Sequence, residues 1–194
     1  IYGPKGSGAL YVRKGTRWKQ MFHGGAQERL RRAGTENVPG IVGFGKAAEM
    51  AAANLEKEAA QVSALRDKMI REVKNNFTHV KLTGHPDRRL PNHASFCFQF
   101  IEGESMLLYL DMDGVAASSG SACTSGSLEP SHVLTSLGIP HEVAHGSLLL
   151  TLGKGNSEED VDYFLEKLAP IIKKLRDMSP LCAFDNCEIE EACM

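Results

Sequence analysis

The longest apolar pattern in the chain runs from about Val38 to Asn75, and it constrains the fold more than any other feature. Apolar residues recur in it at steps of three and four, at Ile41, Phe44, Ala48, Ala52, Leu55, Ala59, Val62, Leu65, Met69 and Val73. This spacing predicts one helix, because residues three and four apart share a face. Pro39 falls in the first turn, where proline is tolerated. The helix would be roughly 50 Å long at 1.5 Å per residue. One small core cannot cover that length, so we expect the helix to link two subdomains.

Shorter strand and helix patterns follow the long helix. Strand composition is found at residues 8–13, 80–82, 95–100, 115–117 and 147–152, and helical patterns at 103–111, 130–138 and 157–175. Ser157 and Asp160 have the spacing of a capping box, and Pro170 predicts a kink or an early end of the last helix. Residues 23–37 are rich in glycine and lack periodicity, which indicates an ordered loop. Strands alternating with helices predict an α/β fold with helices packed on a small sheet.

Charge and cysteine usage exclude several classes of protein. The 22 basic and 24 acidic residues give a net charge of −2, so no field favours nucleic acid or an anionic membrane. No apolar run approaches the ~20 residues that span a bilayer. The five cysteines lack the spacing of a disulfide framework and favour a reducing, cytoplasmic location. A turn signal directly follows Ile1, and we expect the chain to be cut on its N-terminal side.

A single cysteine stands in an unusual loop. Residues 118–127 read SSGSACTSGS, so Cys123 is surrounded only by Gly, Ala, Ser and Thr. Free cysteine is normally buried among apolar residues, whereas this loop predicts an accessible, reactive thiol. The alternative interpretation is a flexible Gly/Ser linker without chemistry.

Three ordered motifs resemble those of one family, the NifS/IscS-type cysteine desulfurases, which are pyridoxal-phosphate enzymes of fold type I and aminotransferase class V. Residues 2–11 read YGPKGSGALY. Residues 24–29 read GGAQER, and residues 32–40 read RAGTENVPG. Residues 118–134 read SSGSACTSGSLEPSHVL. The resemblance extends from Ile1 to about Ser179 and covers roughly the C-terminal half of a full-length member.

The resemblance implies a chemistry in which Cys123 is catalytic. The family's cofactor weakens the C–S bond of substrate L-cysteine by acting as an electron sink. The thiolate of Cys123 would then accept the sulfur as a persulfide, with release of alanine. A mobile loop would carry that sulfur to an iron–sulfur scaffold protein of the IscU/NifU type. The only metal that Cys123 would meet is a scaffold-bound cluster, through the persulfide. The resemblance also implies a homodimer.

Two further positions match binding residues of the family. Thr35 matches the threonine that reaches the cofactor phosphate of the partner subunit, and its alternative role is a turn residue after Gly34. Asn92 follows Arg-Leu-Pro and resembles a substrate-binding asparagine, with turn chemistry after Pro91 as the alternative.

The remaining basic, histidine and cysteine residues are expected to be structural. Arg29, Arg31 and Arg32 could help to bind phosphate or contact a second subunit, but we interpret Arg29 and Arg31 as part of a solvated face. We assign structural roles to His93, His132, His141, His145 and Cys97. The spacing of Cys182, Cys187 and Cys193 matches no zinc or cluster signature, and the tail that holds them is expected to be disordered.

The chain departs from the family pattern in two places. The family's cofactor-binding lysine precedes the YGPKG motif and would lie upstream of Ile1; Lys5 belongs to the GPKG turn and is not a substitute, so the fragment alone is expected to be inactive. The family's substrate-binding arginine, in a motif resembling GSIRFSLG, corresponds to Leu149. A leucine offers no hydrogen-bond donor to a carboxylate.

The resemblance implies a division of the chain. Residues 1–37 would end the large cofactor domain, 38–75 form the linking helix, 76–179 form the small α/β domain with the cysteine loop, and 180–194 form the tail. Two functional hypotheses stay open. The chain is part of an active cysteine desulfurase, as Cys123 and Thr35 favour, or of a catalytically silent homologue that acts as a scaffold-docking or sulfur-relay module, as Leu149 favours.

Overall fold

The computed structural model describes residues 1–120 and 129–180. The chain forms two compact units, the first of residues 1–56 and the second beginning at Lys57. Cys123 and the tail cysteines Cys182, Cys187 and Cys193 lie outside the described residues. Among the described helices none is both long and apolar enough to cross a membrane.

The first unit contains a short turn of helix and the start of the long one. Helix α1 (Gln27–Leu30) is irregular, because Glu28 and Arg29 both have positive φ. Helix α2 (Val38–Asn76) begins where the periodicity predicts and ends one residue later than expected. The N-terminal segment lies against it, since a Cβ at Gly43 would be only 2.7 Å from Pro4 Cγ. Glycine is therefore required at residue 43 for this close approach.

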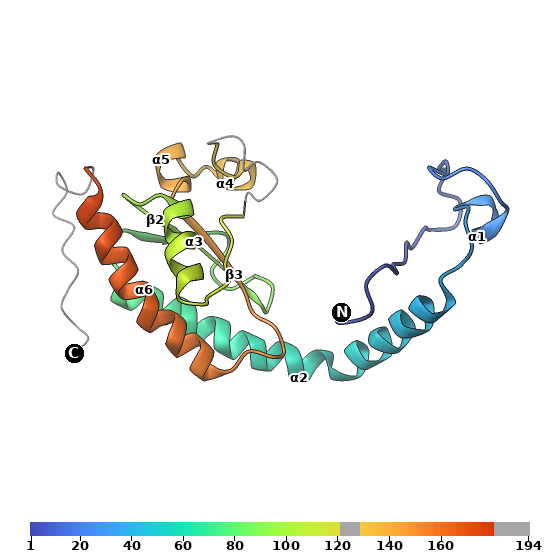
Figure 1. The fold of residues 1–194 in the computed structure, drawn as a ribbon, viewed down its shortest axis with the longest axis horizontal. Coiled ribbons are helices and arrows are strands. Elements are labelled where there is room, and N and C mark those ends of the chain that lie inside the picture. The colour runs from blue at the N-terminus through green and yellow to red at the C-terminus, as the bar shows by residue number, and fades with distance from the viewer. Residues whose placement is uncertain (121–128, 181–194) are drawn as a thin grey trace. The chain divides into compact units, whose positions relative to one another are not determined.

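The second unit is built on a three-stranded antiparallel sheet in the order β1-β2-β3 (Figure 1). Strand β1 (Val80–Leu82) pairs with β2 (His93–Phe98), and β2 pairs with β3 (Ser147–Thr151). Successive side chains of a strand point to opposite faces. Ala94, Phe96 and Phe98 accordingly face the main core, while Cys97 belongs to a second, smaller cluster.

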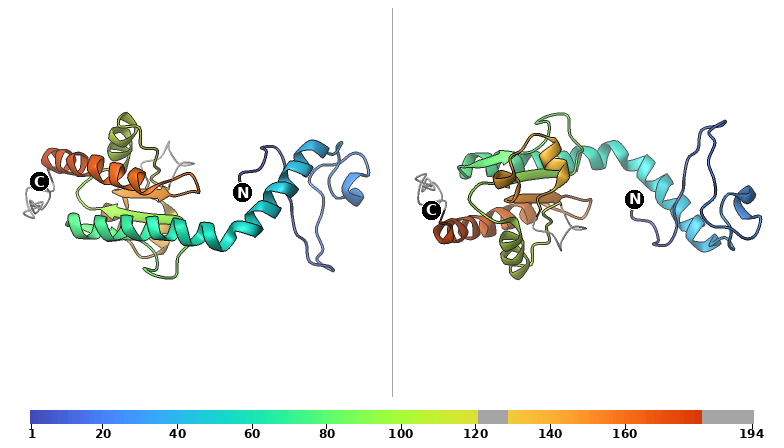
Figure 2. Two further views of the ribbon diagram at one scale, coloured as in Figure 1. Left: turned by 90° about the horizontal axis from the view of Figure 1, so that it is seen from below. Right: turned by 90° about the horizontal axis from the view of Figure 1, so that it is seen from above.

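Helices cover both faces of this sheet (Figure 2). The main core joins the sheet to the second half of α2, to α3 (Gly103–Met112) and to α6 (Glu158–Met178). The smaller cluster joins Cys97 to residues of α4 (His132–Ser136), α5 (His141–Ala144) and the segment between them. The predicted arrangement of helices on a small sheet is therefore present.

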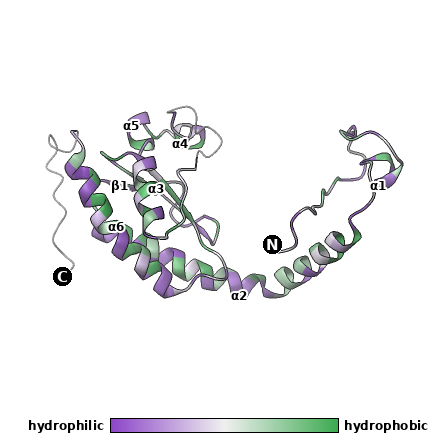
Figure 3. Cartoon of the chain, in the orientation of Figure 1, coloured by the Kyte–Doolittle hydropathy of each residue, from purple (hydrophilic) through white to green (hydrophobic). Residues whose placement is uncertain are grey.

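Helix α6 shows how local signals and packing combine. The Ser157 hydroxyl accepts a hydrogen bond from the Asp160 N–H, and the Asp160 carboxylate accepts one from the Ser157 N–H, which confirms the capping box. Hydrophobic and hydrophilic residues are interspersed along α6 (Figure 3), as expected for a helix that buries one face. The expected early end at Pro170 is wrong, because the helix continues to Met178. Pro170 is exposed, and buried Leu168, Ile171 and Ile172 on either side hold the helix to the core.

Two expected strands are absent from the described residues. Residues 8–13 have no regular structure, because strand composition needs a partner strand and the described residues supply none. Residues 115–117 also lack strand structure, and only Ser118 forms a bridge, to Leu149. Helix α5 was not predicted, because a single turn is too short to show periodicity.

Candidate functional site

The first end of the cysteine loop is tied to strand β3. The Leu149 N–H donates to the Ser118 carbonyl at 2.6 Å, and the Ser118 N–H donates back to the Leu149 carbonyl at 3.1 Å. One residue later, the hydroxyl of buried Ser147 donates to the Ser119 carbonyl at 2.9 Å. The Gly120 N–H donates to the Ser118 hydroxyl at 3.0 Å. The chain is thus held through residue 120, immediately before the segment that contains Cys123.

The second end of the loop is held by helix α4. Ser131 is buried, and its carbonyl accepts hydrogen bonds from the N–H groups of Leu134 at 3.0 Å and Thr135 at 3.2 Å. Leu134 packs in the cluster around Cys97. Both ends of the predicted sulfur-carrying loop are therefore fixed within one folded unit, whereas its cysteine, the central prediction, lies outside the described residues.

Leu149 lies beside the base of this loop. It is half-buried and stands on the opposite face of β3 from Leu148 and Leu150, which belong to the main core. A Cβ built on Gly120 would be 3.8 Å from Leu149 Cδ2. A side chain at position 149 therefore borders the chain that leads to Cys123, and in this protein that side chain is purely apolar.

Asn92 ends a loop that arginines hold together. The Arg89 guanidinium donates hydrogen bonds to the carbonyls of Thr83, His85 and His93 at 2.9 to 3.2 Å. Buried Arg66 donates to the Leu90 carbonyl at 2.8 Å. Burial lowers the pKa of Arg89, and the nearby Arg66 charge lowers it further. These two guanidinium groups bind backbone carbonyls, and they thereby fix the loop before strand β2.

The sheet brings Asn92 and Leu149 into the same region without direct pairing. The Asn92 carbonyl accepts a hydrogen bond from the Leu152 N–H at 3.0 Å. Leu149 pairs with Ser95 across the β2-β3 ladder, three residues further along than Asn92. At about 3.4 Å per residue the two positions are roughly 10 Å apart along the strand.

Two titratable groups on this sheet have shifted pKa values. Burial raises the pKa of the Cys97 thiol to about 11, although the Lys81 charge opposes the shift. Because only the thiolate is nucleophilic and Cys97 is fully buried, we expect its thiol to be unreactive in the folded protein. Burial, followed by the Arg89 charge, lowers the pKa of His93.

Thr35 lies in the first unit in an exposed segment without regular structure, directly after a bend at Gly34. It is itself exposed and follows Gly34, whose φ is +108° and whose N–H donates to the Gln27 side chain at 3.2 Å. Within the described residues the Thr35 hydroxyl has no hydrogen-bond partner, so it is available to another molecule. Lys5 is exposed in a turn, as expected from its GPKG motif.

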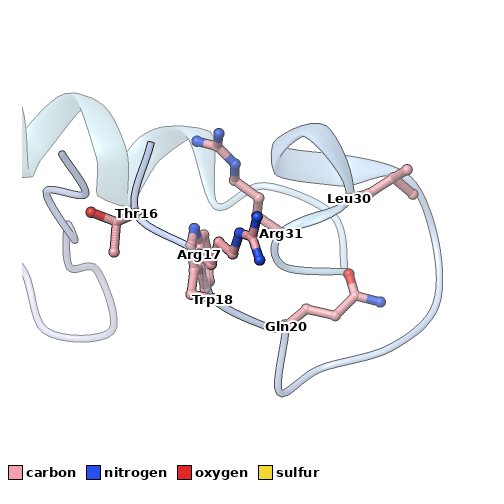
Figure 4. A pocket seen from close by; sticks show the side chains of 6 residues that line it. All are labelled: Thr16, Arg17, Trp18, Gln20, Leu30 and Arg31. Atoms are coloured by element: carbon pink, nitrogen blue, oxygen red, sulfur yellow. The ribbon is translucent and has the colours of Figure 1, made fainter. Parts of the chain in front are cut away.

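The three arginines near Thr35 have different surroundings. Arg29 is exposed. Arg31 lies over the Trp18 ring at 5.9 Å and Arg32 over the Phe22 ring at 4.7 Å. A hollow of about 320 Å³ is lined by Thr16, Arg17, Trp18, Gln20, Leu30 and Arg31, and Arg17, Trp18 and Arg31 lie next to one another in it (Figure 4). The hollow is apart from Thr35, which does not line it.

The residues that anchor the loop were not predicted from the sequence. Ser147 and the Ser118–Leu149 bridge hold its first end, and Arg89 holds the segment before Asn92. The alternation in residues 147–151 could have indicated that Ser147 and Leu149 share a face, because side chains two apart in a strand do so.

Comparisons with known proteins give the family. Residues 1–164 match the model described as aminotransferase class-V. The chain is 58% identical over 180 residues to cysteine desulfurase IscS of Methanosarcina thermophila, covering 92% of this chain and 44% of that protein. It is 49% identical over 180 residues to cysteine desulfurase NifS of Azotobacter vinelandii, covering 93% and 45%.

Solved structures agree with this relationship. A NifS-like protein matches with a TM-score of 0.78 and 36% identity, covering 89% of this chain and 44% of that one. A NifS-like protein from Rickettsia africae matches with a TM-score of 0.72 and 26% identity, covering 81% and 41%.

The chain belongs to the class-V aminotransferase family. Within that family its relatives are cysteine desulfurases of the IscS and NifS type, which confirms the resemblance and the predicted α/β fold, part of a fold type I transferase. The chain spans less than half the length of these relatives.

Proposed function

We propose that the protein is a cysteine desulfurase in which Cys123 receives sulfur from L-cysteine. The Cys123 thiolate attacks the substrate sulfur, and an S–S bond forms as the substrate C–S bond breaks. The electron pair of that bond goes to carbon, which takes a proton, so L-cysteine and the thiol become alanine and a persulfide. No outside oxidant or reductant is required.

The observation that carries this proposal is the anchored base of the loop. Residues 118–120 are held by backbone and hydroxyl hydrogen bonds to β3, and Ser131 is buried at the other end. A carrier thiol must reach both the substrate and the acceptor, and it must return to the same place. A Gly/Ser segment gives the thiol this reach, and the fixed ends of the loop keep it in one region. A linker without chemistry would not need ends that are fixed in this way.

Pyridoxal phosphate belongs to the proposal as the cofactor. When bound, it supplies the electron sink that weakens the substrate C–S bond. The described residues fit one part of its site: Thr35 presents an exposed hydroxyl without a partner in the described structure, beside the Gly34 N–H that is already bonded to Gln27. We assign Thr35 to the cofactor phosphate of a partner subunit, which makes the protein a homodimer.

We also assign Asn92 to the substrate, and an iron–sulfur scaffold protein to the role of acceptor. Asn92 is half-buried on a loop held by Arg89 and Arg66, which preorganises its position. The scaffold assignment rests on the resemblance of the three sequence motifs to the NifS/IscS-type family. The five cysteines, which lack disulfide spacing, support a cytoplasmic location.

The second candidate is a catalytically silent homologue that docks a scaffold or relays sulfur. Leu149 favours it, since an apolar side chain borders the loop base where the family pattern has an arginine. Such a protein would keep the loop but bind L-cysteine poorly.

Replacing single cysteines in the full-length protein tests the proposal. Cys123→Ala should abolish persulfide formation and sulfide release while leaving cofactor colour unchanged, because the thiol acts after the cofactor binds. The matched control is the triple replacement of Cys182, Cys187 and Cys193 by Ala, which should change little. Loss of persulfide in the triple variant together with its retention in Cys123→Ala would show that the assignment is wrong.

A further inference from the structure

Helix α5 begins at His141 and is followed directly by its C-cap residue His145, so one helical turn carries both histidines. The His145 N–H donates to the His141 carbonyl at 3.1 Å, which is the helical i to i+4 bond. The two ring centres are 6.0 Å apart and the ring planes make an angle of 67°. Both side chains are exposed, and within the described residues neither ring forms a hydrogen bond.

The rest of the turn holds this arrangement in place. Pro140 precedes α5, and its carbonyl accepts the Ala144 N–H at 2.9 Å. Ala144 is fully buried in the cluster around Cys97. Because the buried side of the turn is fixed, the side that carries His141 and His145 faces outward.

The ring separation suits a shared metal ion. Zinc binds imidazole nitrogen at about 2.0–2.1 Å, which places the metal roughly 3.2 Å from each ring centre. At a tetrahedral angle two such rings have centres about 5 Å apart. The observed 6.0 Å exceeds this separation by about 1 Å, and exposed imidazoles can rotate to bring one nitrogen of each ring to a shared ion.

We propose that His141 and His145 form a binding site for a late divalent transition metal, with Zn²⁺ or Cu²⁺ as the ions of suitable chemistry. Imidazole nitrogen suits these ions, whereas Mg²⁺ and Ca²⁺ require oxygen ligands. The adjacent carboxylate of Glu142 adds negative charge that favours a cation. The site is independent of the proposed desulfurase reaction.

The site binds metal and does not hydrolyse peptides. Residues 141–145 read HEVAH, the spacing of a zinc-peptidase motif on a helix. A catalytic zinc site needs three protein ligands, and the described part of the chain holds no group of three His, Cys, Asp or Glu that could bind a metal. Water fills the remaining positions on the ion.

Imidazole ¹⁵N resonances of the uniformly labelled, untagged protein, followed while ZnCl₂ is added, test this site. His141 and His145 should shift with one common midpoint, and MgCl₂ should shift neither. His141→Gln should raise the midpoint for His145 at least about tenfold, because one imidazole no longer chelates. His132→Gln, which changes an exposed histidine on α4, should leave the midpoint unchanged.

Three results would overturn the proposal. The first is that the imidazole resonances of His141 and His145 do not shift with Zn²⁺, and the second is that they shift with different midpoints. The third is that His145 responds to Zn²⁺ in the His141→Gln variant as it does in the wild type. Circular dichroism of each variant separates a lost ligand from a lost fold.

Discussion

Leu149→Arg is the substitution that separates the active enzyme from the silent homologue. Leu149 is half-buried, and its side chain lies beside Gly120 at the base of the cysteine loop. The backbone bonds between Leu149 and Ser118 do not depend on the side chain, so the loop base survives the change. An arginine there would offer two parallel donors to a substrate carboxylate.

The expected magnitude follows from the strength of a charged hydrogen bond. Such bonds contribute about 1.5–3 kcal/mol, which corresponds to roughly 10- to 150-fold in affinity. The wild-type protein should therefore have a high KM for L-cysteine. Leu149→Arg should lower KM at least about tenfold with a smaller change in kcat, the pattern of restored uniform binding.

Steady-state kinetics of alanine release by the full-length protein measure both constants. Leu149→Met is the matched control, because it keeps an apolar side chain of similar volume and should leave KM unchanged. The reasoning is refuted if the wild type already binds L-cysteine tightly and Leu149→Arg has no effect or raises KM. Another residue would then hold the carboxylate, and the silent homologue would lose its main support.

Three further experiments test the structure of the second unit. Burial raises the Cys97 pKa to about 11, so roughly one thiol in a thousand is ionised at pH 8. Cys97 should therefore resist iodoacetamide in the native protein and react in guanidinium chloride. Rapid labelling of the native protein would contradict its burial. Ser147→Ala removes the hydrogen bond to Ser119 and should cost about 1 kcal/mol of unfolding free energy in urea and slow persulfide formation, whereas Ser136→Ala on the exposed face of α4 should do neither. Pro170→Ala restores a helical N–H in α6 and should raise the unfolding free energy by about 2 kcal/mol. An unfolding free energy below that of the wild type would show that the proline stabilises the helix at this position.

The long helices were predictable because their periodicity is a local property. Residues 38–75 repeat at steps of three and four, and α2 follows that pattern to within one residue. The capping box at Ser157 needs only two residues at the right spacing. The early end at Pro170 was wrongly expected, because buried residues on both sides of the proline outweigh one lost hydrogen bond.

The strands and the site depended on contacts that a sequence does not display. Residues 8–13 have strand composition but no partner in the described structure, and at residues 115–117 pairing is limited to the neighbouring Ser118. The four-residue spacing of His141 and His145 brings the two rings together only if the chain between them is helical, and α5 is that helical turn. The anchoring of residues 118–120 likewise depends on the distant strand β3.

The most direct test of the account is the location of the sulfur after reaction. The full-length protein is incubated with L-cysteine and pyridoxal phosphate, alkylated, digested and analysed by mass spectrometry. We expect an added sulfur atom on the peptide that contains Cys123, and none on the peptide that contains Cys97. Sulfur found on another cysteine while Cys123 stays unmodified would contradict the account.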